Sequence, residues 1–105
     1  MTRMANEAYV EAVLSLVERI PPGRVMSYGS VSEWVRGRTG RGSPRVVGNV
    51  MARYGGAVPW HRVVAGNGRL QPGNEVEAFQ RLTAEGVPFR DDKVDMARAV
   101  WYPDD

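Results

Sequence analysis

Arginine is the residue type in this sequence whose number and spacing point most directly to chemistry. Residues 24–69 contain eight arginines and one acid, Glu33, so this segment carries a net charge of +7. The remainder carries −5, with tail acids at Asp91, Asp92, Asp95, Asp104 and Asp105. A guanidinium presents two N–H donors that match a pair of phosphate oxygens. The segment therefore favours nucleic acid as the partner, and a solvated surface without a specific partner is the alternative.

The chain of 105 residues has no cysteine and a single histidine, His61. Disulfides, thiolate metal ligands and a cysteine nucleophile are therefore excluded. A zinc site would need carboxylates for its remaining ligands, and no spacing of acids indicates one. We expect neither a metal nor another cofactor.

The composition is typical of a soluble globular protein, with 43% hydrophobic and 25% charged residues. Its length supports one domain over residues 1–105. No apolar run approaches the roughly 18 residues that span a bilayer. Residues 1–7 are polar with one positive charge, so no leader peptide is expected. We expect a monomer without membrane association, located in the cytoplasm, or associated with the nucleoid if the source is prokaryotic.

Three helices are expected to position the arginines. Apolar residues recur at helical spacing over residues 5–20, and a Pro-Pro-Gly sequence follows and ends that helix. Ser27 can cap a second, short helix that ends before Gly37. A Ser-Pro pair at residues 43–44 begins a third helix that runs to about Tyr54. The two later helices and their Gly/Arg-rich loop predict a helix-turn-helix.

The third helix is expected to have two different faces. Four residues at the spacing of a buried stripe form its apolar face: Val46, Val47, Val50 and Met51. Three polar residues take positions that face outward: Arg45, Asn49 and Arg53.

A small β wing is predicted after the third helix. Residues 60–65 include a β-branched pair, and a Gly-Asn-Gly turn at residues 66–68 lets the chain reverse into Arg69 and Leu70. The fold class predicted from these elements is mainly α with a small β wing, a winged helix-turn-helix-like DNA-binding domain.

One more helix is expected over residues 75–85, with Gly86 as its C-terminal stop. Its inward side chains are predicted to be Val76, Phe79 and Leu82. Short extended pieces are expected at residues 87–89 and 100–102. The acidic end after Pro103 is the segment in which disorder is expected.

Three motifs carry a family resemblance. They read IPPGRVMSYG at residues 20–29, PRVVG at residues 44–48 and PWHRVV at residues 59–64, and a Glu-Gly pair follows at residues 85–86. Their order and spacing resemble the IPxGxVxSYG, RxVG and PCHRV motifs of the DNA-binding domain of alkylguanine-DNA alkyltransferases. Three motifs in one order are more specific than any single tetrapeptide. The resemblance extends over residues 9–89.

Trp60 stands where that family keeps its alkyl-accepting cysteine. An indole N–H only donates hydrogen bonds, so it cannot replace a thiolate as the acceptor of an alkyl group. The N-terminal domain that often precedes the family's DNA-binding domain is also expected to be absent. Both departures resemble alkyltransferase-like proteins, which recognise O6-alkylguanine in DNA and pass the lesion to nucleotide excision repair. The resemblance implies a non-enzymatic protein that flips the damaged nucleotide of double-stranded DNA into a pocket.

The resemblance also implies roles for individual residues. Arg45 matches the arginine that fills the gap left by the flipped nucleotide, where a planar cation can replace part of the lost stacking. Tyr28 matches the tyrosine that crowds the flipping phosphate and contacts the base; a core aromatic is the alternative. The DNA contacts implied in this way are Ser27, Tyr28, Arg45, Asn49 and Arg53.

The expected lesion pocket consists of Tyr28, Met51, Trp60, Val63 and Arg69; Arg69 is included because of its place in the predicted wing. Trp60 would form an apolar wall beside the alkyl group, with plain packing as the alternative. Met51 would lie beneath the pocket, and the backbone near Val63 would read the guanine edge. Arg69 and the loop at residues 71–73 would form the other rim, with the guanidinium stacked on the base.

His61 and Glu85 match the pair that helps to deprotonate the transferase cysteine. Without a thiol to serve, a structural hydrogen bond is favoured over a new catalytic role. Two other functions stay open: a transcription regulator that reads promoter sequence through the major groove, and a hydrolase in which this pair activates water.

Overall fold

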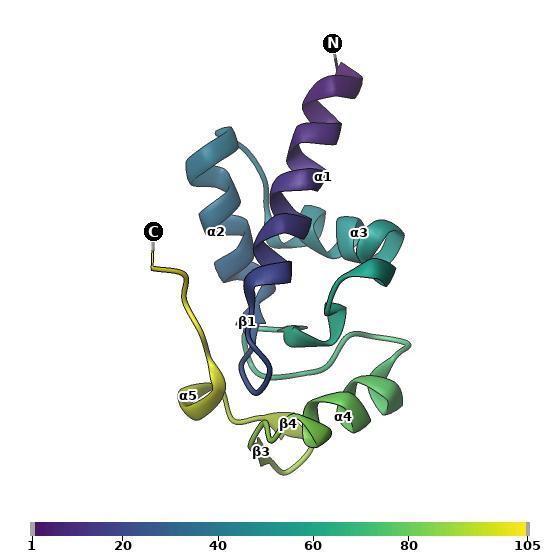
Figure 1. The fold of residues 1–105 in the computed structure, drawn as a ribbon, viewed down its shortest axis with the longest axis vertical. Coiled ribbons are helices and arrows are strands. Elements are labelled where there is room, and N and C mark those ends of the chain that lie inside the picture. The colour runs from purple at the N-terminus through teal and green to yellow at the C-terminus, as the bar shows by residue number, and fades with distance from the viewer. Residues whose placement is uncertain (1, 105) are drawn as a thin grey trace.

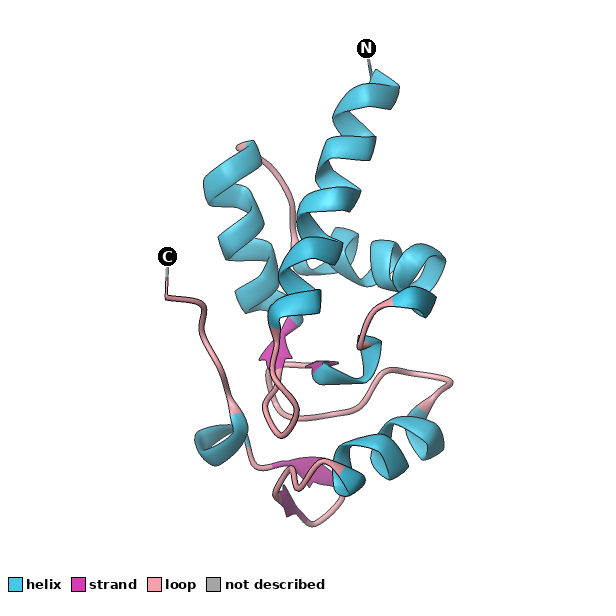
Figure 2. Ribbon diagram, viewed as in Figure 1, coloured by secondary structure: helices cyan, strands magenta, loops and turns pink. Residues whose placement is uncertain are grey.

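The computed structural model describes the backbone of residues 2–104 and the side chains of residues 7–104. Figure 1 shows two parts, a helical bundle in the N-terminal half and a smaller unit below it in the C-terminal half. The bundle consists of α1 (Thr2–Arg19), α2 (Tyr28–Thr39) and α3 (Pro44–Tyr54). Helices dominate the secondary structure, as Figure 2 shows, and the predicted fold class is confirmed.

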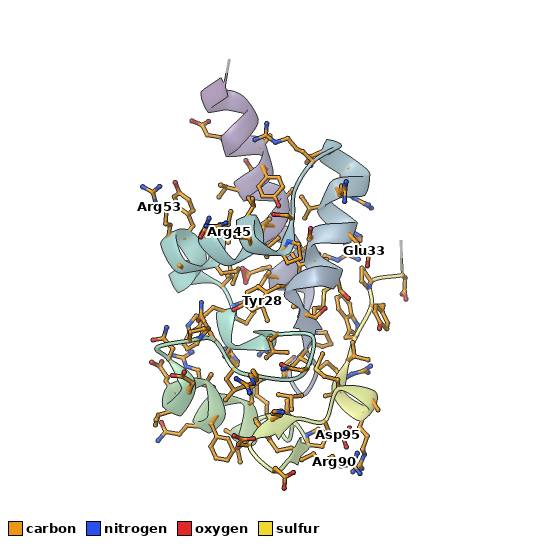
Figure 3. All side chains as sticks on the ribbon, turned by 180° about the vertical axis from the view of Figure 1, so that it is seen from behind. Tyr28, Glu33, Arg45, Arg53, Arg90 and Asp95 are labelled. Atoms are coloured by element: carbon orange, nitrogen blue, oxygen red, sulfur yellow. The ribbon has the colours of Figure 1, made fainter. Side chains whose placement is uncertain are left out.

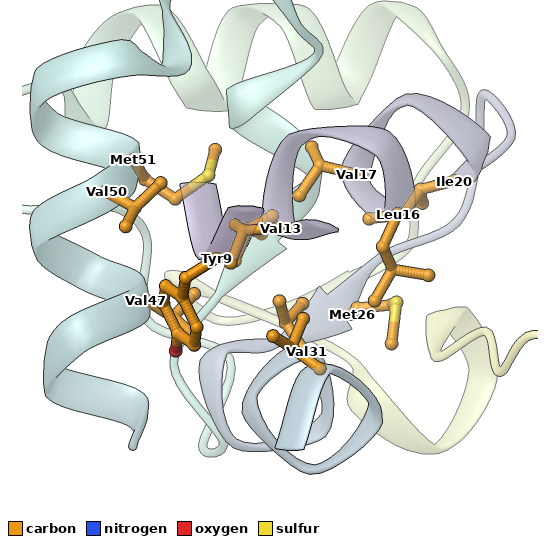
Figure 4. Packing of buried hydrophobic residues seen from close by; sticks show 12 residues of the cluster. Tyr9, Val13, Leu16, Val17, Ile20, Met26, Val31, Val47, Val50 and Met51 are labelled. Carbon is orange, nitrogen blue, oxygen red and sulfur yellow. The ribbon is translucent and has the colours of Figure 1, made fainter. Parts of the chain in front are cut away.

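The bundle is held together by the apolar stripe that the sequence predicts for α1. Tyr9, Val13, Leu16, Val17 and Ile20 are buried along it. They pack against side chains of α2, α3 and the segments beside them, and Figure 4 shows this cluster closely. The members contributed by the rest of the chain are Met26, Val31, Val35, Val47, Val50, Met51 and Val63.

The predicted cap at Ser27 and the predicted helix start at Ser43 and Pro44 are confirmed, and Ser43 is also an N-cap. The Ser27 hydroxyl accepts a hydrogen bond from the Ser30 N–H at 3.0 Å, and the Ser43 hydroxyl accepts one from the Val46 N–H at 3.3 Å. The predicted end of α2 is wrong, since the helix runs through Gly37 to Thr39 and ends at Gly40 in the left-handed conformation. Gly37 is exposed, and its cost of about 1 kcal/mol relative to alanine is small beside the apolar burial of the helix.

One residue of the predicted apolar face of α3 does not belong to it. Val47, Val50 and Met51 are buried, but Val46 is 40% exposed. The buried stripe is centred on the other three residues, and Val46 lies at its edge.

The predicted wing differs from the structure in its pairing. Residues Trp60–Arg62 form a 3₁₀ turn, and only Val63–Val64 are a strand, β2. This strand pairs in parallel with β1 (Met26–Ser27), not with the chain that follows the turn. The Gly-Asn-Gly turn does form, and the Ala65 N–H donates to the Arg69 carbonyl at 2.9 Å across it.

A second, smaller core lies under the C-terminal half. It is formed by Val25, Val64, Leu82, Val87, Val94 and Ala99. Around it lie α4 (Glu75–Ala84), the antiparallel strands β3 (Phe89–Arg90) and β4 (Lys93–Val94), and α5 (Met96–Ala99). The extended pieces expected near residues 87–89 and 100–102 correspond to β3 and to a bridge between Val25 and Val100. Neither β4 nor α5 was predicted.

The inward face predicted for α4 is only partly right. Leu82 is buried together with Ala78, but Val76 is 73% exposed and Phe79 is 44% exposed. The Phe79 ring instead contacts the Phe89 ring edge-on at a centroid distance of 4.8 Å. The helix ends at Ala84, one residue before the predicted end, and the predicted stop Gly86 follows with a φ of 84°.

Over residues 2–104, no helix is long and apolar enough to cross a bilayer. Of the segment after Pro103 for which disorder was expected, Asp105 lies outside the described residues.

Candidate nucleic-acid interface

Tyr28 and Pro72 separate two hollows on the surface of the protein. The first, which we call the α3 groove, has a volume of about 490 Å³ and is lined by both residues together with Pro44, Arg45, Gly48 and Gln71. The second, which we call the Arg69 cavity, has a volume of about 690 Å³. Besides Tyr28 and Pro72, its walls include Ala65, Arg69, Leu70, Glu75 and Asp92.

Tyr28 is fixed in this position by the start of α2. It is the first residue of the helix, directly after the N-cap Ser27, whose neighbour Met26 pairs with Val63 in the parallel ladder. Its ring packs against the helical core, and Figure 3 shows it below α3 in the middle of the molecule. Burial raises the pKa of the Tyr28 hydroxyl, so it remains a neutral phenol at physiological pH. It can therefore both donate and accept hydrogen bonds.

The outward face of α3 carries the three polar residues that the sequence placed there. Arg45, Asn49 and Arg53 are exposed, and Figure 3 labels the two arginines on this helix. Arg45 lines the α3 groove, whereas Asn49 and Arg53 do not. A side-chain carbon at Gly48 would meet nothing within 4 Å, so the groove is open beside Arg45.

The structure divides the predicted lesion pocket into two sets. Tyr28 and Arg69 line the Arg69 cavity, but Met51, Trp60 and Val63 line neither of the two hollows. Met51 and Val63 are buried in the helical core, and Trp60 is half-buried against it. Tyr28 packs against that same core and so links the two sets.

Two side chains contact the Trp60 ring. The Arg81 guanidinium of α4 lies 5.5 Å from the ring centroid, and Arg81 is held by an ion pair of 2.7 Å with Glu77. The His61 ring meets the indole edge-on at a centroid distance of 5.9 Å. Trp60 is therefore held on one side by a cation from another helix.

His61 and Glu85 are brought together, with 2.8 Å between Nε2 and a carboxylate oxygen. Glu85 also receives two hydrogen bonds from Arg62, of 3.0 and 2.7 Å, and Arg62 donates a third to the Ile20 carbonyl at 2.8 Å. Burial alone would raise the pKa of Glu85, but the hydrogen bonds from Arg62 and His61 lower it to about 2. The carboxylate is therefore ionised at neutral pH.

This arrangement fixes the tautomer of neutral His61. An ionised carboxylate only accepts hydrogen bonds, so Nε2 carries the proton and Nδ1 has the free lone pair. His61 is buried, and its Nδ1 has no hydrogen-bond partner within the described part of the chain.

Three arginines have structural roles that the sequence did not reveal. Arg62 ties Glu85 to the end of α1, Arg81 covers Trp60, and Arg24 donates to the carbonyls of Ala99 and Val100. All three join segments far apart in the sequence, and periodicity carries no signal for such contacts. One indication was available for Arg62. It directly follows His61, the residue that the family resemblance pairs with the acid of the Glu-Gly sequence.

Among the side chains of residues 7–104, no three histidine or acidic groups lie close enough together to hold a metal ion.

Comparison with known proteins gives consistent matches. Residues 8–87 match the family described as "6-O-methylguanine DNA methyltransferase, DNA binding domain". Proteins of Escherichia coli K12 and Shigella flexneri called "DNA base-flipping protein" are each 34% identical over 104 residues, which span 91% of this chain and 76% of theirs.

Two solved structures from S. pombe have the same fold. One is Atl1 in complex with damaged DNA containing O6-carboxymethylguanine, with a TM-score of 0.75 and 28% identity over 92% of this chain and 97% of that one. The other is an ATL in complex with DNA, with a TM-score of 0.71 and 27% identity over 93% and 97% of the two chains.

Proposed function

This chain belongs to the family of the 6-O-methylguanine DNA methyltransferase DNA-binding domain, and we propose that it binds O6-alkylguanine in double-stranded DNA without removing the alkyl group. In this proposal the damaged nucleotide is flipped out of the duplex into a pocket of the protein. The relatives named for base flipping and the Atl1 complex with damaged DNA support it.

The observation that carries the proposal is the position of Tyr28 between the α3 groove and the Arg69 cavity. A nucleotide rotated out of a duplex leaves a gap on one side and needs a pocket on the other. The α3 groove offers the gap side, where Arg45 is exposed and free to enter the base stack. The Arg69 cavity offers the pocket side, and its volume falls in the range of small-molecule sites, roughly 300–1,000 Å³.

The polar residues of α3 supply affinity for the backbone. A guanidinium at Arg45 can stack on the bases beside the gap and donate hydrogen bonds to the unpaired cytosine. We propose that DNA phosphates are contacted by Arg53, Asn49 and the Ser27 hydroxyl. These contacts position the duplex but read no sequence.

Trp60 is assigned the family's pocket position at the back of the site. Its indole is half-buried and packs, like Tyr28, against the core that contains Met51 and Val63. An O6 substituent held in the Arg69 cavity lies against Ala65, Leu70 and Pro72, and Trp60 does not line that cavity. The indole is therefore proposed as a more distant apolar surface toward which a longer substituent would extend. Arg69 is the side chain proposed to stack on the base from the other rim.

The chemistry available argues against alkyl transfer. The chain has no cysteine, so it has no thiolate to accept an alkyl group. A protein that binds the lesion without repairing it needs a second system to act on the complex. We therefore propose that proteins of nucleotide excision repair recognise the bound lesion.

The test compares two short duplexes that differ by a single O6-methylguanine, with fluorescence anisotropy at near-physiological salt. The expected result is binding to the lesion that is at least about tenfold tighter, equal to about 1.4 kcal/mol, with the methyl group still on the DNA after long incubation. Equal binding to both duplexes would contradict lesion recognition and favour a general or sequence-directed DNA-binding domain. Loss of the methyl group would instead assign chemistry to His61 and Glu85.

A further inference from the structure

We infer that Glu75 and Asp92 make the Arg69 cavity select uncharged O6 substituents and disfavour substituents that carry a carboxylate. This inference rests on the proposed function, because it takes the flipped base to enter the Arg69 cavity. It adds the chemical class of adduct that the cavity accepts.

The charged side chains of the cavity come from three segments. Arg69 follows the Gly-Asn-Gly turn, Glu75 is the first residue of α4, and Asp92 lies in the turn between β3 and β4. The segment with Arg69 is fixed against β4, because the Val94 N–H donates to the Gly68 carbonyl at 2.9 Å. Glu75 and Asp92 both line the cavity, and both are exposed at its rim.

The ionisable groups of this wall sum to a negative charge. Glu75 and Asp92 bring two carboxylates against one guanidinium, and the Tyr28 phenol stays neutral because burial raises its pKa. Among the described residues, no ion pair joins Arg69 to either acid, so neither carboxylate is neutralised by it. A third carboxylate brought in on a substrate would be repelled by both acids.

The uncharged part of the wall suits an alkyl group. Ala65, Leu70 and Pro72 line the same cavity and offer apolar contact without a charge requirement. A methyl or larger neutral alkyl group gains from this contact and loses nothing to the acids. The S. pombe Atl1 structure contains DNA with O6-carboxymethylguanine, whose substituent carries a carboxylate. Because of Glu75 and Asp92, we predict that this chain has a different order of affinities for O6 adducts than a protein that binds that anion.

The experiment uses three duplexes that differ only in the substituent on one guanine O6: methyl, carboxymethyl and its neutral amide, carbamoylmethyl. The amide and the acid have nearly the same size, so the ratio of their dissociation constants isolates the charge. We expect the full chain to bind the amide about threefold or more tighter than the acid. The ratio should shrink as salt is raised, because ions screen an exposed repulsion.

Two substitutions locate the effect. The double variant E75Q/D92N should bring the ratio of amide to acid close to one while the affinity for the methyl adduct changes little. The matched control is D91N, which removes a neighbouring charge from the same turn but not from the cavity wall, and which should keep the wild-type ratio. Asparagine tolerates the positive φ of 59° found at Asp91, so the control does not strain the turn. Thermal unfolding of each variant checks that it is folded.

The outcomes separate this inference from the proposed function. Tight binding of the methyl adduct with equal affinity for acid and amide, or a ratio that D91N changes as much as E75Q/D92N does, would overturn the inference and leave the proposed function standing. Failure to prefer the methyl adduct over unmodified DNA would overturn both.

Discussion

The Arg62 guanidinium donates two hydrogen bonds, of 3.0 and 2.7 Å, to the carboxylate of Glu85, which lies 23 residues later in the sequence. The same carboxylate holds His61, and Arg62 reaches on to the carbonyl of Ile20 at the end of α1. One ion pair therefore ties the helical bundle to the end of α4. The arginine of the family's PCHRV motif stands at the same position as Arg62, and a structural role for the pair of His61 and Glu85 remains the prediction.

The first prediction follows from the low pKa of Glu85. A carboxyl whose pKa falls from 4.5 unfolded to about 2 folded stabilises the protein above pH 4.5, and this stability is lost as the pH falls toward 2. The shift corresponds to about 3 kcal/mol at neutral pH. Glu85→Gln should therefore lower the free energy of unfolding at pH 7 by a few kcal/mol and flatten its pH dependence between pH 4.5 and 2.

Urea titrations at several pH values measure this effect. Glu77→Gln is the control, since it breaks an exposed ion pair within one helix and should cost about 0.5 kcal/mol or less. If Glu77→Gln and Glu85→Gln lower the free energy of unfolding equally, the ion pair between Arg62 and Glu85 does not hold the two halves of the protein together.

The second prediction concerns Arg45 and lesion binding. Arg45→Ala should weaken binding to a duplex with O6-methylguanine by about tenfold, because the stack is left unfilled after flipping. Stability should change by less than about 0.5 kcal/mol, since the side chain is exposed. Arg90→Ala is the charge-matched control, and Figure 3 shows Arg90 on the lower unit away from α3. Anisotropy titrations measure both, and an equal loss for the two variants would reduce Arg45 to a general phosphate contact.

The third prediction separates the ring of Tyr28 from its hydroxyl. Tyr28→Phe keeps the wall between the two hollows and should cost about threefold in lesion affinity, the value of one hydrogen bond. Tyr28→Ala removes the wall and should abolish the preference for damaged over undamaged DNA. Because burial raises the pKa of Tyr28 above its ordinary value of 10.0, wild-type binding should show no titration of Tyr28 between pH 6 and 9. Full lesion preference in Tyr28→Ala would remove Tyr28 from the site.

The fourth prediction tests how the Arg69 segment is held. Gly68 has a φ of 90°, and a side-chain carbon there would overlap the backbone of Val94. Gly73 has a φ of 84° but meets nothing within 4 Å. Gly73→Ala should cost about 1 kcal/mol from backbone strain alone, and Gly68→Ala clearly more, because the segment must also move off β4. Thermal melts compare the two, and lesion binding by Gly68→Ala should fall with stability.

Local chemistry made much of the bundle predictable. The caps at Ser27 and Ser43 act within one turn of their helices, and the stripe of α1 repeats over several turns, so both leave a signal in neighbouring residues. The outward position of Arg45 followed from the same periodicity. The predicted buried faces were wrong at Val46 and Val76. Burial at these positions depends on how wide the contact with the rest of the protein is, and the helical repeat alone does not give that width.

Long-range pairing accounts for the features that could not be predicted. The parallel ladder between Met26 and Val63 joins segments that are separated by α2 and α3, so no local motif marks it. The predicted wing relied on a turn that does form, but β2 pairs elsewhere. The separation of Arg69 from Trp60 in the expected lesion pocket depends on this pairing of β2 with β1.

The Arg69 cavity is assembled from both ends of the sequence, since Tyr28 and Asp92 share its wall. During synthesis the chain emerges from its N-terminus, and α1 to α3 with their exposed arginines can form before β3 and β4 exist. An incomplete chain would then attract any nucleic acid without distinguishing damage. The Arg69 cavity is complete only once Asp92 has been synthesised. Products that stop before Asp92 are therefore expected to bind nucleic acid without preferring damaged sites.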